Sequence, residues 1–135
     1  MKASKSNTTR VLPTGAYIET CDNSGAKIIK IFGVKGHKTT KGRMPAAGVG
    51  DMVIASVKRG RPDMVKQVVL AVIVRQKKEF RRPDGTRIKF EDNAAVVLKD
   101  DKGNPKGTLI KGPVAREACN RYPGISKLAK IVIWN

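Results

Sequence analysis

Residues 66–75 read Lys-Gln-Val-Val-Leu-Ala-Val-Ile-Val-Arg, and positions 68–74 form the longest strongly apolar run of the chain. Branching at the β-carbon restricts the first side-chain torsion, so valine and isoleucine fit a pleated strand better than a helix. An unbroken apolar run of this length is typical of a strand that is buried on both faces. The run is far too short to span a membrane as a helix. We therefore predict an interior strand here, with the fold built around it.

The composition of the whole chain favours the same fold class. The 135 residues include 14 valines and 11 isoleucines but only 5 leucines, and 13 glycines and 7 prolines are spread among them. Many short strands separated by frequent turns are typical of a small sandwich or a closed barrel. A chain of this length suits one domain. The sequence therefore predicts a single, mainly β domain.

Turn residues divide the chain into further strands. Asp-Asn-Ser-Gly at 22–25 predicts a hairpin between the segments on either side, and Pro-Asp-Gly at 83–85 predicts a second tight turn. Besides 66–75, strands are predicted at 16–21, 26–34, 52–58, 86–90 and 94–98, and the segment 108–110 also fits a short strand.

The C-terminal part has a different pattern from the β-rich core at 15–112. Pro113 suits the first turn of a helix, because its missing N–H would have no helical partner there. Pro-Gly at 123–124 is expected to end that helix, with one more helical turn at 125–130 and an apolar tail at 131–134. We therefore expect a helical appendage at 113–135 within the same domain. A flexible basic arm is expected at 1–14.

Charge is the strongest indication of function. The chain has 28 Lys and Arg residues against 11 Asp and Glu residues, a formal net charge of +17. Such a surplus favours a polyanionic partner. The N-terminus has no apolar signal-peptide core, and Cys21 and Cys119 are too few for a disulfide framework or a four-cysteine zinc site. Both cysteines are expected to pack in the core of a protein that stays in a reducing compartment.

No motif in the chain predicts catalysis. His37 is the only histidine, and it lies in a basic loop that offers no positioned substrate for a general base. Gly-Val-Gly at 48–50 lacks the third glycine and the following helix of a dinucleotide-binding turn. The carboxylates are thinly spread and do not make a metal-binding loop. We expect no enzyme activity, cofactor, metal ion or small-molecule substrate.

Two segments hold most of the informative cations: a long loop at 35–50 and a hairpin at 75–90. Glycines in the loop allow the backbone to approach a polyphosphate, and the tight turn of the hairpin would hold its cations in place. Lysine, arginine and backbone N–H groups are the usual phosphate ligands. The residues predicted to contact phosphate are Lys35, His37, Lys38, Lys41 and Arg43 in the loop, and Arg75, Lys77, Lys78, Arg81 and Arg82 at the hairpin.

The type of nucleic acid can be inferred in part. The chain has only six aromatic residues, and a protein that binds single strands normally offers several aromatic platforms for bases. It has no helix-turn-helix or zinc-finger spacing for the major groove of DNA. The remaining mode is recognition of folded RNA through its backbone and shape.

Several motifs, in order along the chain, resemble one known family. They include Asp-Asn-Ser-Gly-Ala at 22–26, Ala-Gly-Val-Gly-Asp at 47–51, Ala-Val-Ile-Val-Arg at 71–75, Arg-Arg-Pro-Asp-Gly at 81–85, Phe-Glu-Asp-Asn-Ala at 90–94 and Gly-Pro-Val at 112–114. Together they resemble the universal large-subunit ribosomal protein L-fourteen family, over residues 15–127. The lead-in at 45–47 and the form of 90–93 are similar to the archaeal and eukaryotic branch, whose eukaryotic members are called L-twenty-three.

This resemblance implies a fold and a set of partners. The family fold is a five-stranded β-barrel with a projecting β-ribbon and a short helical C-terminal segment. The implied role is structural: binding of large-subunit ribosomal RNA in the cytoplasmic ribosome, beside neighbours of the L-three and L-twenty-four types. The segment 113–121 would face small-subunit RNA at an intersubunit bridge, with Arg116 and Arg121 as candidates. The same surface would serve a subunit anti-association factor.

Two alternatives remain open at this point. The first is a free-standing nucleic-acid binder, such as a chromatin or chaperone protein, which would bind arbitrary duplex DNA as well as RNA. The second is an enzyme with an unrecognised site around Asp51 or Asp84, although Asp84 is more simply a turn residue.

Overall fold

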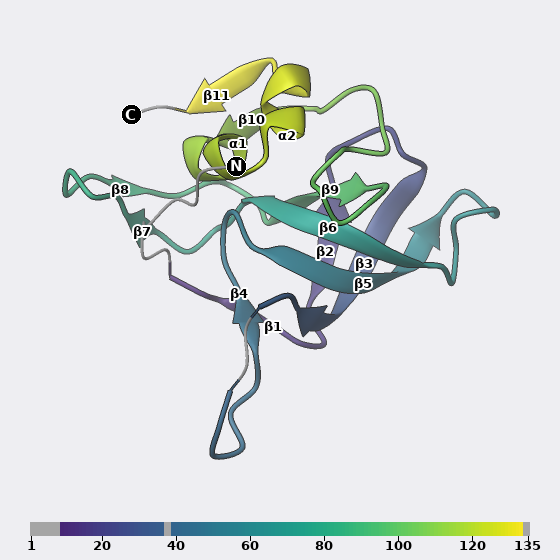
Figure 1. The fold of residues 1–135 in the computed structure, drawn as a ribbon, viewed down its shortest axis with the longest axis horizontal. Helices are drawn as coiled ribbons and strands as arrows, with labels where there is room; N and C mark the ends of the chain where they lie inside the picture. The colour runs from purple at the N-terminus through teal and green to yellow at the C-terminus, as the bar shows by residue number, and fades with distance from the viewer. Residues whose placement is uncertain (1–8, 37–38, 134–135) are drawn as a thin grey trace.

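Five strands close into a barrel at the centre of the molecule (Figure 1). The computed structural model describes residues 9–36 and 39–133. Around the barrel the order is β2-β3-β5-β6-β9; β2 and β9 run parallel, and every other neighbouring pair is antiparallel. The barrel strands are β2 (Tyr17–Thr20), β3 (Ala26–Val34), β5 (Met52–Gly60), β6 (Val68–Arg75) and β9 (Ala94–Leu98). This arrangement confirms the expected five-stranded barrel.

Strand β6 is buried on both faces from its fourth residue onward, as predicted. Ala71 and Ile73 point into the barrel, where they join one apolar cluster. Val72 and Val74 point outward into a second cluster, which also contains Val114 and residues of the C-terminal helices. All four of these β6 side chains are 0% exposed. The apolar run therefore has no polar alternation because both of its faces are covered.

The predicted hairpin at the start of the barrel is also present. β2 and β3 are antiparallel, with Tyr17 opposite Lys30 and Glu19 opposite Ile28. The predicted bounds of β3 and β9 match the structure, while β5 extends two residues further than expected, to Gly60. The segment 108–110 is not a strand, and only Ile110 forms an isolated bridge, to Asp22.

The sequence predicts a flexible basic arm at 1–14, and this is wrong for the last residues of the arm, which are paired with another strand. Leu12–Pro13 form β1, which pairs with β4 (Ala46–Ala47) at the end of the long loop. Leu12 is buried in the barrel cluster. The apolar side chain and the ladder to Ala47 hold this end of the arm against the barrel. Residues 1–8 lie outside the described residues.

The C-terminal part differs from the prediction at Pro113. Pro113–Ala115 form strand β10, which pairs in parallel with β11 (Ile131–Ile133), so the first helix, α1 (Arg116–Arg121), begins three residues later than expected. The backbone of β10 is held extended by this ladder, and the apolar tail supplies the partner strand. Pro123 occupies the first turn of a second helix, α2 (Pro123–Leu128), instead of only ending the first.

The remaining elements form the predicted ribbon. β7 (Phe80–Arg81) and β8 (Arg87–Ile88) make a short antiparallel hairpin that extends from the barrel (Figure 1). β8 is shorter than the strand predicted at 86–90. Within the described part of the chain, no helix is long and apolar enough to cross a membrane.

Both cysteines are free thiols and are buried, as expected. Cys21 packs beside β9, where its Sγ lies 3.6 Å from the carbonyl oxygen of Ala95. Burial raises the pKa of the Cys21 thiol to about 11, and burial also raises the pKa of Cys119. Burial therefore favours the protonated form of both thiols.

Candidate nucleic-acid interface

The tip of the long loop is a tight turn at 40–43 that carries two exposed cations. Lys41 and Gly42 both have positive φ, 58° and 74°. The turn is closed by a hydrogen bond from the backbone N–H of Arg43 to the carbonyl oxygen of Thr40, at 3.3 Å, and the Thr39 hydroxyl donates to the Arg43 carbonyl oxygen. The side chains of Lys41 and Arg43 are exposed. Figure 1 shows the loop as a finger that reaches away from the barrel.

The base of this loop carries a third predicted cation, Lys35. It follows β3 directly, its side chain is exposed, and its Nζ lies 3.9 Å from a carboxylate oxygen of Asp101. Such an exposed pair contributes little to stability and leaves the ammonium accessible. His37 and Lys38, the other predicted loop contacts, lie outside the described residues.

The hairpin presents a second group of cations. Lys77, Lys78 and Arg81 are exposed, as the sequence predicts. Arg87 and Lys89, on the returning strand, are exposed too. Sequence reasoning missed these two because they are isolated among other residue types and do not form a run.

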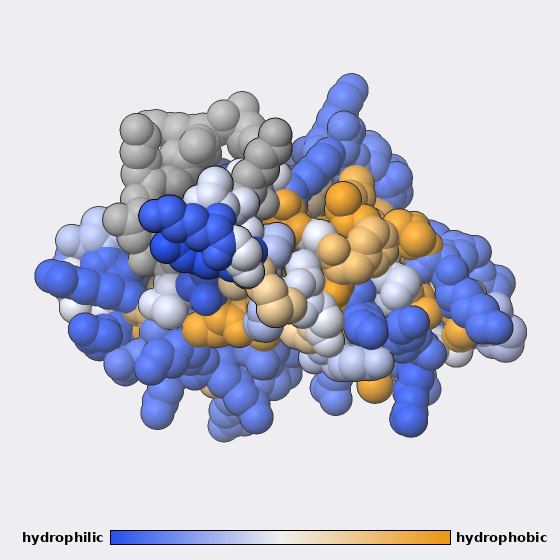
Figure 2. All heavy atoms as spheres, turned by 90° about the horizontal axis from the view of Figure 1, so that it is seen from below, coloured by the Kyte–Doolittle hydropathy of each residue, from blue (hydrophilic) through white to orange (hydrophobic). Residues whose placement is uncertain are grey.

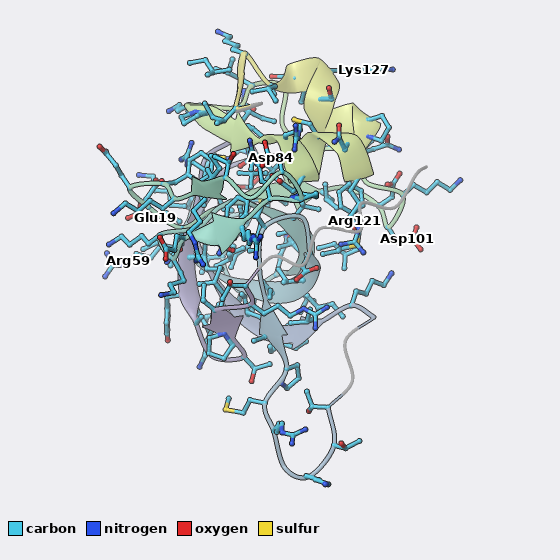
Figure 3. The ribbon with its side chains drawn as sticks, turned by 90° about the vertical axis from the view of Figure 1, so that its left-hand side faces the viewer. Glu19, Arg59, Asp84, Asp101, Arg121 and Lys127 are labelled. Atoms are coloured by element: carbon cyan, nitrogen blue, oxygen red, sulfur yellow. The ribbon has the colours of Figure 1, made fainter. Side chains whose placement is uncertain are left out.

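The turn of the hairpin is stabilised by its own hydrogen bonds. The Arg82 N–H donates to the Thr86 carbonyl oxygen, and the Thr86 N–H donates to the Asp84 carboxylate, at 2.8 and 2.9 Å. The bonds from Thr86 lower the pKa of Asp84. The positive charges of Arg116 and Arg82 lower it further. Asp84 is labelled in Figure 3. The hydrogen bonds of the turn therefore account for Asp84, and no enzyme site is needed to explain it.

A buried glutamine fixes the base of the hairpin. Gln76 is 0% exposed, and its amide donates to the carbonyl oxygens of Thr9 and Lys78, at 3.2 and 2.9 Å. Its side-chain oxygen accepts from the N–H of Val49, at 3.0 Å. The neighbouring Lys77 N–H donates to the Asn93 side chain, at 2.9 Å. Lys77 and Lys78 therefore leave the barrel from a fixed backbone.

Arg82 is buried, so the prediction that it contacts phosphate is wrong. Its side chain is 0% exposed and forms an ion pair with Glu117 of α1, with Nε 3.0 Å from Oε2. Its Nη2 also donates to the Ile133 carbonyl oxygen in β11, at 2.8 Å. Arg82 points to the opposite side of the hairpin from Arg81, because successive side chains of an extended strand alternate. The ion pair and the hydrogen bond of Arg82 therefore link the hairpin to α1 and to β11.

Arg75 needs the same correction. Its side chain is only 10% exposed, and Nε and Nη2 donate to the two carboxylate oxygens of Asp92. Its Nη1 donates to the carbonyl oxygens of Lys111 and Pro113, both at 3.0 Å. The guanidinium is therefore committed to interactions within the fold.

A cleft of about 950 Å³ opens at the base of the hairpin. Lys77 and Lys89 line it together with the half-buried ring of Phe90. Glu91 and Asp92 also line it, so it is less cationic than the hairpin itself. An open cleft with two lysines and an aromatic ring suits a nucleotide of a folded RNA, since phosphate and base can be contacted together.

The loop and the hairpin do not form one continuous patch. Figure 1 shows them extending from the barrel in different directions. Hydrophilic side chains cover most of the face seen in Figure 2, with apolar patches between them. Two separate projections of this kind can contact separate parts of a large RNA.

The two residues predicted for an intersubunit bridge both lie in α1. Arg116 begins the helix and is half-buried, near the hairpin turn that holds Asp84. Arg121 ends it, and its Nη1 donates to the Gly50 carbonyl oxygen and to Asp51, at 3.2 and 3.3 Å. Arg121 is therefore tied to the barrel, and Arg116 is the better candidate for an outside contact.

Asp51 also has a structural explanation. Its carboxylate accepts a hydrogen bond from the Gly48 N–H, at 2.8 Å, and pairs with Arg10 and Arg121. Over residues 9–36 and 39–133, no group of three or more His, Cys, Asp or Glu side chains could hold a metal ion.

Comparisons with known proteins agree with this description. The model of the family described as "Ribosomal protein L14p/L23e" matches residues 11–133. The chain is 54% identical to the large ribosomal subunit protein uL14 of Nanoarchaeum equitans strain Kin4-M over 133 residues, which are 98% of this chain and 100% of that protein. It is 56% identical to the protein of the same name from Methanococcus maripaludis strain DSM 14266 over 132 residues, which cover 98% and 99% of the two chains. The protein of that name from M. maripaludis strain C7 is 55% identical over 132 residues.

Proposed function

Because the chain belongs to the ribosomal protein L14p/L23e family, we propose that it binds large-subunit ribosomal RNA through the cations of its long loop and its hairpin. The family is structural and not enzymatic, and its members are components of the large ribosomal subunit, in the ribosome of the cytoplasm. What we propose beyond this is which side chains of the chain contact the RNA.

One observation carries this proposal: exposed cations stand on backbone that hydrogen bonds already hold in place. Lys41 and Arg43 are fixed by the closed turn at the loop tip, and Lys77 and Lys78 by the bonds of Gln76 and Asn93. Preorganised cations lose less conformational freedom on binding than flexible ones. This distinguishes the two projections from ordinary solvated charges.

The proposal predicts a large loss of affinity when these projections are neutralised. A variant with glutamine at Lys41, Arg43, Lys77, Lys78 and Arg81 should bind large-subunit ribosomal RNA on the order of 100-fold more weakly, because up to five phosphate contacts are removed. The matched control carries glutamine at five other exposed lysines: Lys58, Lys66, Lys99, Lys102 and Lys130. Filter binding at one salt concentration measures all three proteins. Equal losses in the two variants would mean that net charge, and not these positions, determines binding.

The same assay separates the ribosomal role from a general nucleic-acid binder. Duplex DNA of random sequence, added as competitor at matched salt, should displace the ribosomal RNA only at much higher concentration. Comparable affinity for both would favour the chromatin or chaperone alternative.

The proposal also includes an intersubunit bridge at α1. Replacing Arg116 by glutamine is expected to weaken the association of large and small subunits severalfold without changing binding to large-subunit RNA, because Arg116 is only partly buried and its guanidinium would contact small-subunit RNA. Sucrose-gradient sedimentation of mixed subunits measures this. The control is Arg87→Gln, which removes the same charge from the hairpin. Unchanged association in the Arg116 variant would remove this residue from the bridge.

Protein neighbours are proposed from the family relationship. Proteins of the L-three and L-twenty-four types would contact the outer face of the barrel, and an anti-association factor would compete at the bridge surface. Phe32 and Val68 are exposed on barrel strands, at 52% and 65%, and such apolar side chains would suit protein contacts.

A further inference from the structure

A second cleft, of about 510 Å³, is lined by residues outside the segments 35–50 and 75–90. It adjoins the hairpin segment at Lys111, whose carbonyl oxygen accepts from Arg75. Three parts of the chain form it: the turn between β2 and β3, the end of β5, and Lys111 of the segment before β10. Four cations line it: Lys27, Arg59, Arg61 and Lys111. In Figure 3, Arg59 and Glu19 of this cleft lie on the opposite side of the molecule from Asp101 and Arg121.

Two glycines bring the first two parts together. Gly25 has φ +103°, and a Cβ there would overlap the Arg61 guanidinium. A Cβ at Gly60 would overlap the carbonyl oxygen of Gly25. The close approach lets the Arg61 N–H donate to the Gly25 carbonyl oxygen, at 2.9 Å, and its Nη2 donate to the Ser24 carbonyl oxygen, at 3.2 Å. The guanidinium of Arg61 is therefore held against the turn.

Asn23 fixes the third part of the cleft. Its side-chain oxygen accepts from the N–H groups of Thr108 and Leu109, at 2.8 and 3.1 Å, and its amide donates to the Thr108 hydroxyl, at 2.9 Å. Lys111 continues from this segment, and its N–H donates to the Cys21 carbonyl oxygen, at 2.6 Å. The backbone that carries Lys111 is thus fixed relative to the turn.

The solvent-exposed charges of the cleft are mainly positive. Two carboxylates line it, Glu19 and Asp22. Asp22 is turned inward: it is 9% exposed, its oxygens accept from the Ser24 hydroxyl and the Val97 N–H, both at 3.0 Å, and burial raises its pKa. All four cations are exposed, and Glu19 is the exposed carboxylate among the lining residues. Arg61 also pairs with exposed Asp63 outside the lining, Nε to Oδ1 at 3.6 Å, so Lys27, Arg59 and Lys111 carry most of the available positive charge.

We propose that this cleft is a third RNA contact, which binds the sugar-phosphate backbone of an RNA strand through residues outside the loop and the hairpin. The proposal rests on the proposed function. Guanidinium groups bind phosphate oxygens through two parallel hydrogen bonds, and the lysines add charge. Glu19 would accept a hydrogen bond from a ribose 2′-hydroxyl, which RNA offers. Glu19 repels phosphates and carboxylates alike, so the fit to RNA rests on the ribose 2′-hydroxyl, a hydrogen-bond donor that ionised acidic side chains lack.

The test compares two triple variants of the full chain for binding to purified large-subunit ribosomal RNA over a range of salt concentrations. The cleft variant carries Lys27→Gln, Arg59→Gln and Lys111→Gln, and leaves Arg61 in place because its side chain bonds the turn. The control carries Lys66→Gln, Lys102→Gln and Lys130→Gln, which are exposed lysines outside the cleft. We expect the cleft variant to bind about tenfold more weakly, with a slope of log affinity against log salt that is reduced by about 2 to 3.

The outcomes separate this proposal from the one on which it rests. Wild-type affinity and slope in the cleft variant, with weakened binding when the loop and hairpin are neutralised, would refute the cleft alone. Equal losses in the cleft and control variants would also refute it. Failure of the wild-type protein to bind ribosomal RNA would refute both proposals.

A second measurement identifies what covers the cleft in the assembled subunit. Lys27 and Lys111 should resist acetylation in intact large subunits and become reactive after ribonuclease digestion, while Lys66 serves as the comparison. Reactivity before digestion would mean that the cleft faces solvent. Protection that persists after digestion would mean that protein covers it. Either result would overturn the proposal.

Discussion

Replacing Glu117 by alanine is expected to lower the free energy of unfolding by about 3–5 kcal/mol, because it leaves the buried Arg82 guanidinium without its counter-charge. The two side chains are 5% and 0% exposed. They are joined by two hydrogen bonds, Nε to Oε2 at 3.0 Å and Nη2 to Oε1 at 3.3 Å. Denaturant unfolding followed by circular dichroism measures the change.

Two controls identify the cause of that loss. Arg81→Ala, one residue away but exposed, should change stability by less than about 0.5 kcal/mol. The double variant Arg82→Met with Glu117→Leu should recover most of the stability, since an apolar pair of similar volume often replaces a buried ion pair without loss. Recovery is favoured because Nη1 of Arg82 is buried without a hydrogen-bond partner among the described residues. A stability loss as small for Glu117→Ala as for Arg81→Ala would contradict the buried pair.

Replacing Ile73 by alanine is expected to destabilise the fold by about 2–5 kcal/mol, through lost apolar burial and the cavity that remains. Ile73 is 0% exposed and points into the barrel from the middle of β6. Thermal and urea unfolding measure the effect. Val68→Ala on the same strand is the control, because Val68 is 65% exposed and its truncation should change stability by less than about 0.5 kcal/mol. Similar losses at both positions would mean that the buried part of β6 and its exposed start are not distinguished as described.

Most of the barrel strands could be predicted from local patterns. The apolar run of β6 and the turn residues at 22–25 each specify their structure through the residues they contain, and the bounds of β3 and β9 followed from their β-branched residues. The closure into five strands came from the family resemblance and not from the patterns, which left a sandwich open as well. Strand pairing depends on contacts between distant residues, which periodicity does not encode.

The errors have a common cause in long-range contacts. Arg81 and Arg82 are identical in type and adjacent, yet only Arg82 meets Glu117, which lies 35 residues further along the chain. Pro113 fits a helix start locally, but β11 pairs with it across the C-terminal part. In both cases a partner remote in sequence decides between two local possibilities.

The sequence was enough to predict which segments form the candidate site, but not which of their cations are exposed. The exposed members, such as Lys41 and Lys78, are surface charges in runs that the sequence shows. Arg75 and Arg82 stand in the same runs but are used inside the fold, to fasten the hairpin to the barrel and to α1. The second cleft could not be predicted because its four cations come from three separate parts of the chain and form no run.

The most direct test of the central claim, that a rigid β scaffold holds cations against folded RNA, is the salt dependence of ribosomal RNA binding. For the wild-type protein, log affinity should fall linearly with log salt. In the variant neutralised at Lys41, Arg43, Lys77, Lys78 and Arg81, the slope should be smaller by about 3.5 to 4.5, because each of the five lost phosphate contacts removes about 0.7–0.9. An affinity that does not respond to salt, or a slope that is the same in both proteins, would contradict the claim.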